Sequence, residues 1–335
     1  MANTRGDSGF GTHTTVIVRY LEYLTALARE RHFARAASAC NVTQPTLSAG
    51  IKQLEESLGV LIVERRQRYV GLTVEGERVL AWAHRVLAGY SSLEQELSEL
   101  REGLEGQIRL GAIPVSLPSV AILTAAFAAR HPRTRFQVMS LSSVEIQRGL
   151  DDFTIDAGIT YLDNEPLVGV HTQPLYRERY VLVSHDKVSF TGLKTISWVQ
   201  AATLPLCLLV PSMQNRRILD LIFRTAGAET SPVMETNSLM TLWSHIHFGQ
   251  WSTIVPQTFL LLLRQQEDVI SLPLVEPDAS HVIGLVASSR EPEMPLAREL
   301  FAVAGQVDVA AEIERHIARH WPAVKTIGGA NSSLG

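Results

Sequence analysis

The sequence is poor in cysteine, nearly balanced in charge and free of long hydrophobic runs. Its two cysteines, Cys40 and Cys207, are too few for a framework of disulfide bonds or for a structural zinc site. No apolar run reaches the roughly 18 residues that a membrane span needs, and the N-terminal residues lack the apolar core of a signal peptide. The net charge of −4 argues against a surface that coats nucleic acid or membrane over its whole extent. We therefore expect a soluble, cytoplasmic protein that does not bind membranes.

Hydrophobic residues make up 46% of the 335 residues and charged residues 19%, which is typical of a globular chain of two or three domains. The charge is uneven, because residues 19–72 carry eight basic and five acidic side chains, whereas residues 73–105 carry three and seven. The cluster Arg65-Arg66-Gln67-Arg68 is the sharpest basic feature. Taken alone, such a cluster is more typical of a solvated loop than of a binding site, so its neighbours in the sequence decide its interpretation.

Hydrophobic spacing predicts three helices near the N-terminus, the first over residues 18–31 and the second over residues 34–39. The third has Thr43 as a good N-cap, Pro45 in its first turn and Gly59 as its C-terminal stop. The apolar positions at helical spacing in the first and third helices are Leu21, Leu24, Leu27, Ala28, Leu47, Ile51, Leu54 and Leu58.

The opposite face of the third helix is polar, and it carries Gln44, Thr46, Ser48, Lys52 and Gln53. Short amides and hydroxyls read base edges well, and small side chains permit a close approach, so this face suits a helix in the DNA major groove. An ordinary amphipathic surface helix shows a similar polar face. The helix alone therefore leaves both interpretations open.

The surrounding sequence, HFARAASACNVTQPTLSAGIKQLEESLGV followed by ERRQRYVGLTVEGERVL, resembles the winged helix-turn-helix of LysR-type transcriptional regulators. The matching positions are Phe33, Ala36-Ala37, Thr43-Gln44-Pro45, Leu47-Ser48, Ile51, Leu54-Glu55, Leu58-Gly59, Arg65, Leu72-Thr73 and Glu75-Gly76. The resemblance implies that Gln44, Pro45, Thr46, Ser48 and Lys52 lie on or beside the face that reads DNA. It also implies a wing in which Arg65, Arg66 and Arg68 contact phosphate or the minor groove.

The sequence departs from the family at two places. Ala49-Gly50 stands where the family usually has a basic or polar residue, which would shift base preference or weaken binding. Ile62-Val63 stands where the family usually has phenylalanine before the wing arginine, which would repack the core.

A heptad repeat follows, with successive apolar positions four and three residues apart. Its members are Val79, Ala83, Val86, Tyr90, Leu93, Leu97, Leu100 and Leu104. A single helix cannot bury this stripe on itself, so the helix either packs on the globular body or pairs with a second copy. The family resemblance implies pairing, which brings two DNA-reading heads to one site. Gly103 and Gly106 suit a hinge where this helix ends.

From residue 107 onward, short apolar runs alternate with helical segments in a β-α-β-α-β order, which predicts α/β structure with a mostly parallel sheet. The later segments include a strand over residues 180–184 and a helix over residues 307–319. Two such sets resemble the two-lobed effector domain of LysR-type regulators, which is similar to periplasmic binding proteins. The expected parts are a flexible tail (1–17), the winged helix-turn-helix (18–76), a dimerisation helix (77–105), the effector domain (106–322) and a second tail (323–335). Within the effector domain we expect lobe I at about 106–178 and 283–322, and lobe II at about 179–282.

Hydroxyl and amide side chains follow several strands of this domain, where free helix N–H groups attract anions. We expect effector contacts from Ser116, Ser142, Ser143, Ser212, Asn215, Asn237 and Ser238. The same residue types cap helices for structural reasons alone. The resemblance singles out Ser143, a position that often binds effector. Val115 replaces a position that is often a hydroxyl residue, which favours a small carboxylate or another anion over an aromatic acid or a sulfur compound.

No residue pattern supports catalysis or a bound cofactor or metal. Cys40 and Cys207 lie in apolar segments typical of a core, and His245 and His247 are two residues apart, which places them on different helix faces. We therefore expect a non-enzymatic regulator that binds double-stranded DNA and a small effector and self-associates as a dimer or tetramer. The alternative is a two-lobed binding protein or enzyme whose helix-turn-helix does not read DNA.

Overall fold

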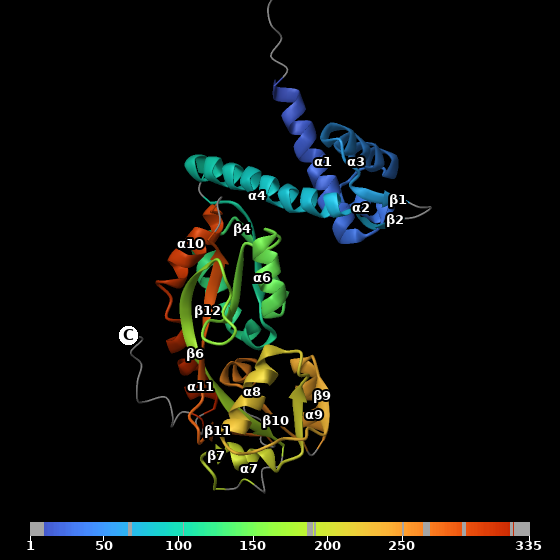
Figure 1. Cartoon of the computed structure of the whole chain (residues 1–335). Helices are drawn as coiled ribbons and strands as arrows, with labels where there is room; N and C mark the ends of the chain where they lie inside the picture. The colour runs from blue at the N-terminus through green and yellow to red at the C-terminus, as the bar shows by residue number, and fades with distance from the viewer. Residues whose placement is uncertain are drawn as a thin grey trace, which may run out of the picture. The chain divides into compact units, whose positions relative to one another are not determined.

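The computed structural model describes residues 10–65, 69–102, 104–185, 190, 192–249, 251–263, 269–289, 293–321 and 324. The chain separates after Leu100 into two compact units, and each unit is described by itself (Figure 1). Within these residues no helix has both the length and the apolar character needed to cross a membrane.

The first unit is a helical cluster with a short antiparallel hairpin. Its elements are α1 (Phe10–Glu30), α2 (Phe33–Ala39), α3 (Gln44–Leu58), β1 (Val63–Arg65), β2 (Tyr69–Leu72) and most of α4 (Val74–Glu102). Leu24 and Leu27 of α1 are fully buried with Leu47 and Ile51 of α3, which are the stripes that the sequence predicts.

The two predicted tails have different outcomes. The start of α1 at Phe10 corrects the expectation that the first 17 residues form a tail, because residues 10–17 are helical. Residues 1–9 and, apart from residue 324, the second predicted tail lie outside the described residues.

The helix boundaries follow local chemistry. The Oγ1 of Thr43 accepts a hydrogen bond from the backbone N–H of Thr46 at 3.3 Å, which satisfies one free donor at the start of α3. Gly59 ends α3 in the left-handed region at φ +69°, where glycine has no Cβ to clash. Both expectations for this helix are therefore confirmed.

Lobe I of the second unit is an α/β layer structure. Its elements are β3 (Gly106–Ala112), η1 (Pro114–Ser116), α5 (Leu117–Arg130), β4 (Thr134–Ser140), α6 (Ser143–Asp151), β5 (Ala157–Tyr161), the first part of β6 (Val170–Ser184), β12 (Ser280–Ser288), α10 (Pro295–Ala304) and α11 (Val309–His320). The strand order is β4-β3-β5-β12-β6, in which β4, β3 and β5 are parallel and β12 is antiparallel to both neighbours. The β-α-β-α-β order of the sequence predicts these parallel pairs.

Lobe II is also an α/β structure, and it is built on a second sheet. Its elements are β7 (Ile196–Ser197), α7 (Trp198–Ala202), β8 (Leu206–Leu209), α8 (Gln214–Thr225), β9 (Met234–Thr236), α9 (Leu239–Phe248), β10 (Ser252–Pro256), η2 (Gln257–Leu262) and β11 (Ile270–Val275). Strand β8 is parallel to β9 and β10, whereas β10 and β11 lie antiparallel to β6.

Strand β6 belongs to both sheets. Residues Val170–Arg179 pair with β12 of lobe I, and residues 180–184 pair with β10 of lobe II, so the strand crosses between the lobes at Arg179-Tyr180 (Figure 1). The sequence pattern predicts only residues 180–184 of this strand. In its first part, Pro174 and the polar residues around it interrupt the apolar run that would indicate a strand. The chain returns to lobe I between β11 and β12.

The C-terminal helical segment differs from the sequence prediction. The pattern predicts one helix over residues 307–319, and α11 fills that place, but α10 precedes it and is not predicted. The expected mostly parallel sheet holds for β3, β4 and β5, whereas β12 is antiparallel to β5 and β6, and β10 is antiparallel to β6.

Gly76 in the first turn of α4 has no room for a side chain, since a Cβ there would lie 2.1 Å from the carbonyl oxygen of Ile62. Because that neighbour is backbone, we expect Gly76→Ala to destabilise the first unit by about 3 kcal/mol, the upper part of the range for overpacking. Urea denaturation followed by circular dichroism measures the change. Gly71→Ala, with no atom within 4 Å of its Cβ, is the control, and equal midpoints for the two variants would contradict the prediction.

Candidate nucleic-acid interface and lobe junction

The polar face of α3 is open to solvent at its N-terminal end. Gln44, Pro45 and Thr46 are exposed and Ser48 is half-buried. The hydroxyls of Thr43 and Thr46 are 2.8 Å apart and share a hydrogen bond. The side chain of Gln44 is exposed, so its amide is accessible to a base edge or a phosphate.

Lys52 extends this face along the helix. Its Nζ lies 3.5 Å from Oε1 of Glu56, and both side chains are more than half exposed. An exposed pair of this kind contributes little to stability, so Lys52 can exchange Glu56 for a phosphate oxygen. Of the three wing arginines, Arg65 ends β1 with its side chain outside the described atoms, and Arg66 and Arg68 lie outside the described residues.

Gly50 is a packing residue, whereas its neighbour Ala49 is exposed. A Cβ at position 50 would lie 2.6 Å from the ring of Tyr23 and 2.9 Å from the ring of Tyr20, so glycine lets α3 approach α1 closely. Ile62 and Val63 are buried in the same core. The departures at Gly50, Ile62 and Val63 therefore concern packing, and only Ala49 changes the exposed face.

Glu55 ties the wing to α3, a role that the sequence analysis missed. Its buried carboxylate accepts hydrogen bonds from the backbone N–H groups of Ile62 at 3.0 Å and Val63 at 3.1 Å. On the other side of the hairpin, the hydroxyl of Thr73 donates to the carbonyl of Leu61 at 2.6 Å. The available signal was the place of Glu55 and Thr73 among the residues that match the family. These bonds fix the base of the wing relative to α3.

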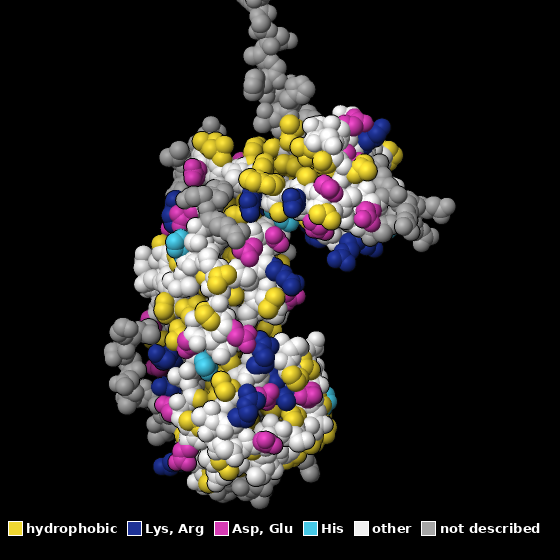
Figure 2. All heavy atoms as spheres, viewed as in Figure 1, with side chains coloured by type: hydrophobic (Ala, Val, Ile, Leu, Met, Phe, Trp, Pro, Cys, Tyr) yellow, Lys and Arg dark blue, Asp and Glu magenta, His cyan; other side chains and the backbone are white. Residues whose placement is uncertain are grey.

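The heptad seam of α4 divides into two parts. Ala83 is fully buried in the core of the first unit and Val79 packs against that core, so neither faces outward. The next four positions, Val86, Tyr90, Leu93 and Leu97, are each 44–52% exposed, and the side chain of Leu100 lies outside the described atoms. Figure 2 shows hydrophobic side chains exposed along this helix.

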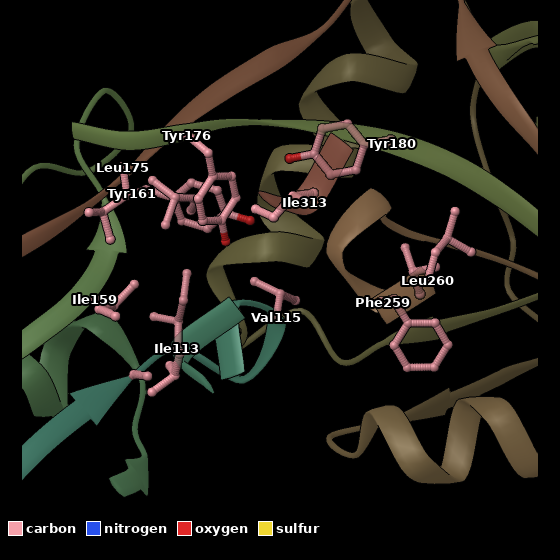
Figure 3. Close-up of a cluster of buried hydrophobic side chains, with 14 of the residues drawn as sticks. Ile113, Val115, Ile159, Tyr161, Leu175, Tyr176, Tyr180, Phe259, Leu260 and Ile313 are labelled. Carbon is pink, nitrogen blue, oxygen red and sulfur yellow. The ribbon is translucent and has the colours of Figure 1, made fainter. Parts of the chain in front are cut away.

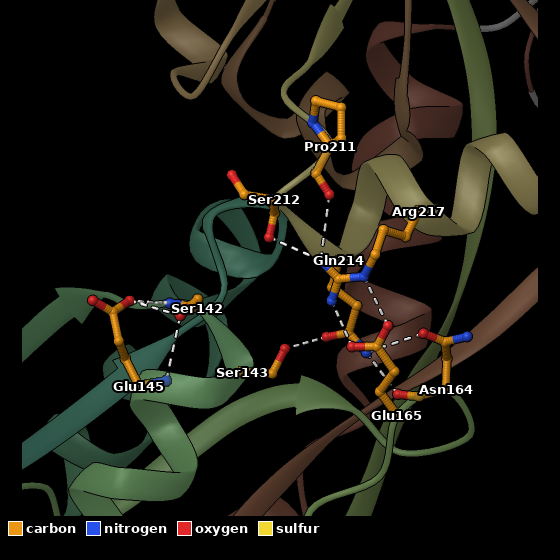
Figure 4. Close-up of polar contacts among 9 residues, drawn as sticks. All are labelled: Ser142, Ser143, Glu145, Asn164, Glu165, Pro211, Ser212, Gln214 and Arg217. Atoms are coloured by element: carbon orange, nitrogen blue, oxygen red, sulfur yellow. Dashed lines mark hydrogen bonds and ion pairs between the residues drawn. The ribbon is translucent and has the colours of Figure 1, made fainter.

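A second set of polar contacts joins the two lobes, and we call it the lobe junction. It connects the first turns of α8 in lobe II with α6, β5 and the segment 162–167 of lobe I (Figure 4). The Oε1 of Gln214 accepts a hydrogen bond from the hydroxyl of Ser143, and its Nε2 donates to the carbonyl of Asn164 at 2.6 Å. Arg217 forms a two-pronged ion pair with Glu165, with N–O distances of 2.8 and 2.5 Å.

The start of α6 is already capped by its own residues. The carboxylate of Glu145 accepts from the backbone N–H and from the hydroxyl of Ser142, both at 2.8 Å, and these hydrogen bonds lower the pKa of Glu145. The predicted effector residue Ser142 therefore serves as a cap. Its neighbour Ser143 is buried and points to Gln214 instead (Figure 4).

The other predicted effector residues fall into three groups. Asn215 is buried at the lobe junction, where its Nδ2 donates to the hydroxyl of Tyr161 at 3.1 Å. Ser116 donates to the carbonyl of Ile113 and Ser238 caps α9, so both make local hydrogen bonds. Ser212 and Asn237 are exposed. The structure thus brings Ser143 and Asn215 to the lobe junction, where the backbone carbonyl of Ser212 also accepts from Arg217 at 2.8 Å. Ser116, Asn237 and Ser238 take no part in the described contacts of the junction.

Four residues of the junction were not predicted from the sequence, namely Asn164, Glu165, Gln214 and Arg217. Their only signal is indirect: Gln214 and Arg217 flank the predicted Asn215 at the start of a helix. Asn164 and Glu165 follow β5 in a segment without regular structure. Their partners come from a different lobe, so no spacing along the chain relates them.

Glu178 is a fully buried carboxyl at the point where β6 leaves lobe I. Its Oε1 accepts from the hydroxyl of Tyr161 at 2.5 Å, and its Oε2 has no hydrogen-bond partner among the described residues. Burial raises the pKa of Glu178 to about 8, so the carboxyl is neutral at pH 7. The rings of Tyr161, Tyr176 and Tyr180 lie nearby among apolar side chains (Figure 3).

Cys207, His245 and His247 pack against neighbouring side chains. Cys207 is fully buried in β8, where burial raises the pKa of its thiol to about 11. His245 stacks on Trp251, whereas His247 stacks on Trp243, so the two rings lie in different surroundings. Within the described part of the chain, no group of three or more His, Cys, Asp or Glu side chains could hold a metal ion.

Glu178→Gln tests the neutral carboxyl, because glutamine has nearly the same shape and does not ionise. The folded-state pKa of Glu178, about 8, lies above the ordinary value of 4.5. The stability from its protonated form is therefore fully present below pH ~4.5 and is lost as the pH rises through ~8. We expect the melting temperature of the wild type to fall relative to that of Glu178→Gln between pH 5 and 8.5. Thermal unfolding with Glu229→Gln, an exposed control, measures this, and a pH-independent difference would contradict it.

Comparison with known proteins places both units in one family. Residues 18–77 match the family described as "Bacterial regulatory helix-turn-helix protein, lysR family", and residues 101–308 match "LysR substrate binding domain". The DNA-binding transcriptional dual regulator OxyR of Escherichia coli (strain K12) is 30% identical over 275 residues, which cover 80% of this chain and 88% of that protein. A probable hydrogen peroxide-inducible genes activator of Streptomyces viridosporus is 32% identical over 242 residues, 71% of this chain and 77% of that protein.

Solved structures of related proteins share the fold of this chain. A full-length OxyR variant from Pseudomonas aeruginosa superimposes with a TM-score of 0.69 at 25% identity, covering 88% of this chain and 98% of that one. Full-length CbnR in complex with its target DNA has a TM-score of 0.64 at 20% identity, which shows the same fold over 86% of this chain and 99% of that one. The two family matches and the identity to OxyR confirm the resemblance seen in the sequence. The chain belongs to the LysR family and is a DNA-binding transcriptional regulator with an effector-binding domain.

Proposed function

We propose that this regulator senses a small carboxylate or a similar anion at the lobe junction and changes its binding to promoter DNA in response. The observation that carries the proposal is the lobe junction itself, where one helix end of lobe II contacts lobe I through Gln214, Asn215 and Arg217. A ligand that alters these contacts changes the arrangement of the lobes, and different affinity for two arrangements is the basis of allosteric control.

DNA recognition is assigned to the exposed end of α3 and to the wing. Gln44 carries an exposed side-chain amide that suits base edges, and Lys52 carries a charge that suits phosphate. Arg65, Arg66 and Arg68 supply the positive charge of the wing. The place of action is the cytoplasm, where bacterial DNA is accessible to the protein.

Self-association is assigned to the exposed part of the α4 seam. Val86, Tyr90, Leu93 and Leu97 recur at heptad spacing and lie about half exposed on a helix that has no other apolar surface to cover them within its described unit. Pairing of two such seams buries them and gives a dimer with two DNA-reading heads. Dimers assemble further into tetramers if the effector domains also pair.

Peroxide sensing is the second candidate, because several relatives are named hydrogen peroxide-inducible genes activators. Thiol chemistry requires a thiolate that peroxide can reach. In this chain burial raises the pKa of Cys207 to about 11, and burial together with the nearby charge of Glu22 raises that of Cys40. Neither thiol meets the requirement, so we favour an effector that is bound rather than one that oxidises cysteine.

Gln44→Ala and Arg66→Ala separate base reading from phosphate contact. We expect Gln44→Ala to reduce the preference for operator sites by about tenfold, and Arg66→Ala to weaken binding to all DNA while lowering the salt slope by about one. Selection from a promoter pool and fluorescence anisotropy at several salt concentrations measure both effects. Gln306→Ala, an exposed glutamine of the second unit, is the control. Weak uniform binding unchanged by either variant would show that the winged head does not read DNA.

Because the pKa of each thiol is raised, we expect hydrogen peroxide to leave the thiols of the folded protein unreacted. At pH 7 we expect Cys207 to react with hydrogen peroxide at least about 100-fold more slowly than free cysteine, because its thiolate fraction is correspondingly small. Mass spectrometry of the treated protein, native and in urea, measures the rates, and operator binding is measured in parallel. A loss or gain of operator binding that disappears in Cys207→Ser would establish peroxide sensing instead.

A further inference from the structure

The contacts of the lobe junction have the chemistry of a bound carboxylate, although every group in them belongs to the chain itself. The carboxylate of Glu165 meets the guanidinium of Arg217 with two hydrogen bonds, at 2.8 and 2.5 Å. This parallel pairing is the geometry in which arginine binds a carboxylate ligand. The hydrogen bond from Arg217 lowers the pKa of Glu165, so the carboxylate is ionised.

Arg217 is held in position by its own lobe. Its Nη1 donates to the carbonyl of Ser212 at 2.8 Å, just before the helix begins (Figure 4). The guanidinium therefore keeps its orientation when Glu165 leaves. Arg216, the preceding residue, is already satisfied by Asp220, by Glu235 and by the carbonyl of Leu209, and is not available to a ligand.

Gln214 makes a second set of hydrogen bonds across the junction. Its amide oxygen accepts from the buried hydroxyl of Ser143, and its amide nitrogen donates to the carbonyl and the side-chain oxygen of Asn164, at 2.6 and 3.1 Å. A carboxylate oxygen of a ligand would accept the same hydrogen bond from Ser143. The negative charge of Glu145 at the cap of α6 disfavours an anion at Ser142, which leaves Ser143 and Arg217 as the receiving groups.

The segment that carries Glu165 is anchored on both sides of this residue. At its end, Val168 exchanges two hydrogen bonds with the side chain of Gln147, at 2.9 and 3.1 Å. Asp163 anchors its start, since its carboxylate accepts from the backbone N–H of Val282 at 2.9 Å and contacts the ring of His281 at 3.2 Å. Two residues later, Glu165 has a φ of +46°, a left-handed conformation that costs a residue with a Cβ some free energy. Its pair with Arg217 is about half exposed, so a competing anion displaces it at low cost.

We propose that Glu165 and Gln214 are internal substitutes for the effector, occupying the carboxylate-binding groups Arg217 and Ser143 until an effector carboxylate displaces them. The inference rests on the proposed function, in which the lobe junction is the effector site. It assigns Arg217 as the cation that binds the effector, and Ser143 as its hydrogen-bond donor. Binding then exchanges an internal carboxylate for an external one, which releases the segment 164–167 from α8.

The experiment compares substitutions on the two sides of the ion pair in the full-length chain. Isothermal titration calorimetry measures binding of acetate, oxalate and benzoate, each against its neutral amide. We expect Glu165→Gln, which removes the internal competitor, to lower the apparent Kd for a carboxylate about tenfold, because more of the protein is competent to bind. We expect Arg217→Gln to raise that Kd at least about tenfold, and Ser143→Ala to raise it to a smaller extent.

Opposite shifts of the Kd in Glu165→Gln and Arg217→Gln are the decisive result. Glu229→Gln and Arg224→Gln, which change the same charges at exposed positions near the other end of α8, should leave the Kd unchanged. A purely structural ion pair predicts that Glu165→Gln and Arg217→Gln shift the Kd in the same direction, and that result would overturn the proposal. Failure of all three carboxylates to bind any variant would also overturn it. Operator binding by the same variants, measured separately, reports on the regulator assignment and distinguishes its failure from that of the internal substitutes.

Discussion

The sharing of strand β6 between two sheets is the constraint on which the effector domain depends. Because β6 pairs with β12 up to Arg179 and with β10 from Tyr180, one continuous strand joins the sheets of the two lobes. The buried carboxyl of Glu178 sits at the crossing with Tyr161 as its hydrogen-bond donor. A charged carboxylate there would be costly, so the neutral form suits this fully buried position.

The crossing and the lobe junction are two ends of one network. Tyr161 donates to Glu178 and accepts from Asn215, so a single side chain links the crossing strand to the first turn of α8. On the same turns, Gln214 makes a buried, neutral contact with Ser143, whereas the ion pair of Arg217 with Glu165 is about half exposed. The ion pair is therefore the part of this network that solvent and solutes reach most easily. In the proposed function, a ligand acts at this exposed end while the buried contacts keep the lobes aligned.

In the DNA-binding unit, local sequence predicts where a helix begins and ends and which of its faces is buried. Thr43, Pro45 and Gly59 specify the limits of α3 by capping chemistry within a few residues, and the stripe through Leu47 and Ile51 specifies which face is buried. The heptad spacing predicts one continuous seam, but the fold divides it. Ala83 lies in the core of its own unit because α4 begins against the wing, and only the later positions remain exposed.

Local sequence is enough to specify the family, the order of α/β elements and the exposed polar face of α3, because these depend on neighbours within one or two helical turns. The roles of Ser142 as a cap and of Ser143 as a partner of Gln214 depend instead on the folded domain, as does the pairing of Arg217 with Glu165. The partners of the two junction contacts are 71 and 52 residues apart in the chain and lie on different lobes. No periodicity relates such positions, since their meeting follows from the crossing of β6 and from the placement of α8 beside lobe I.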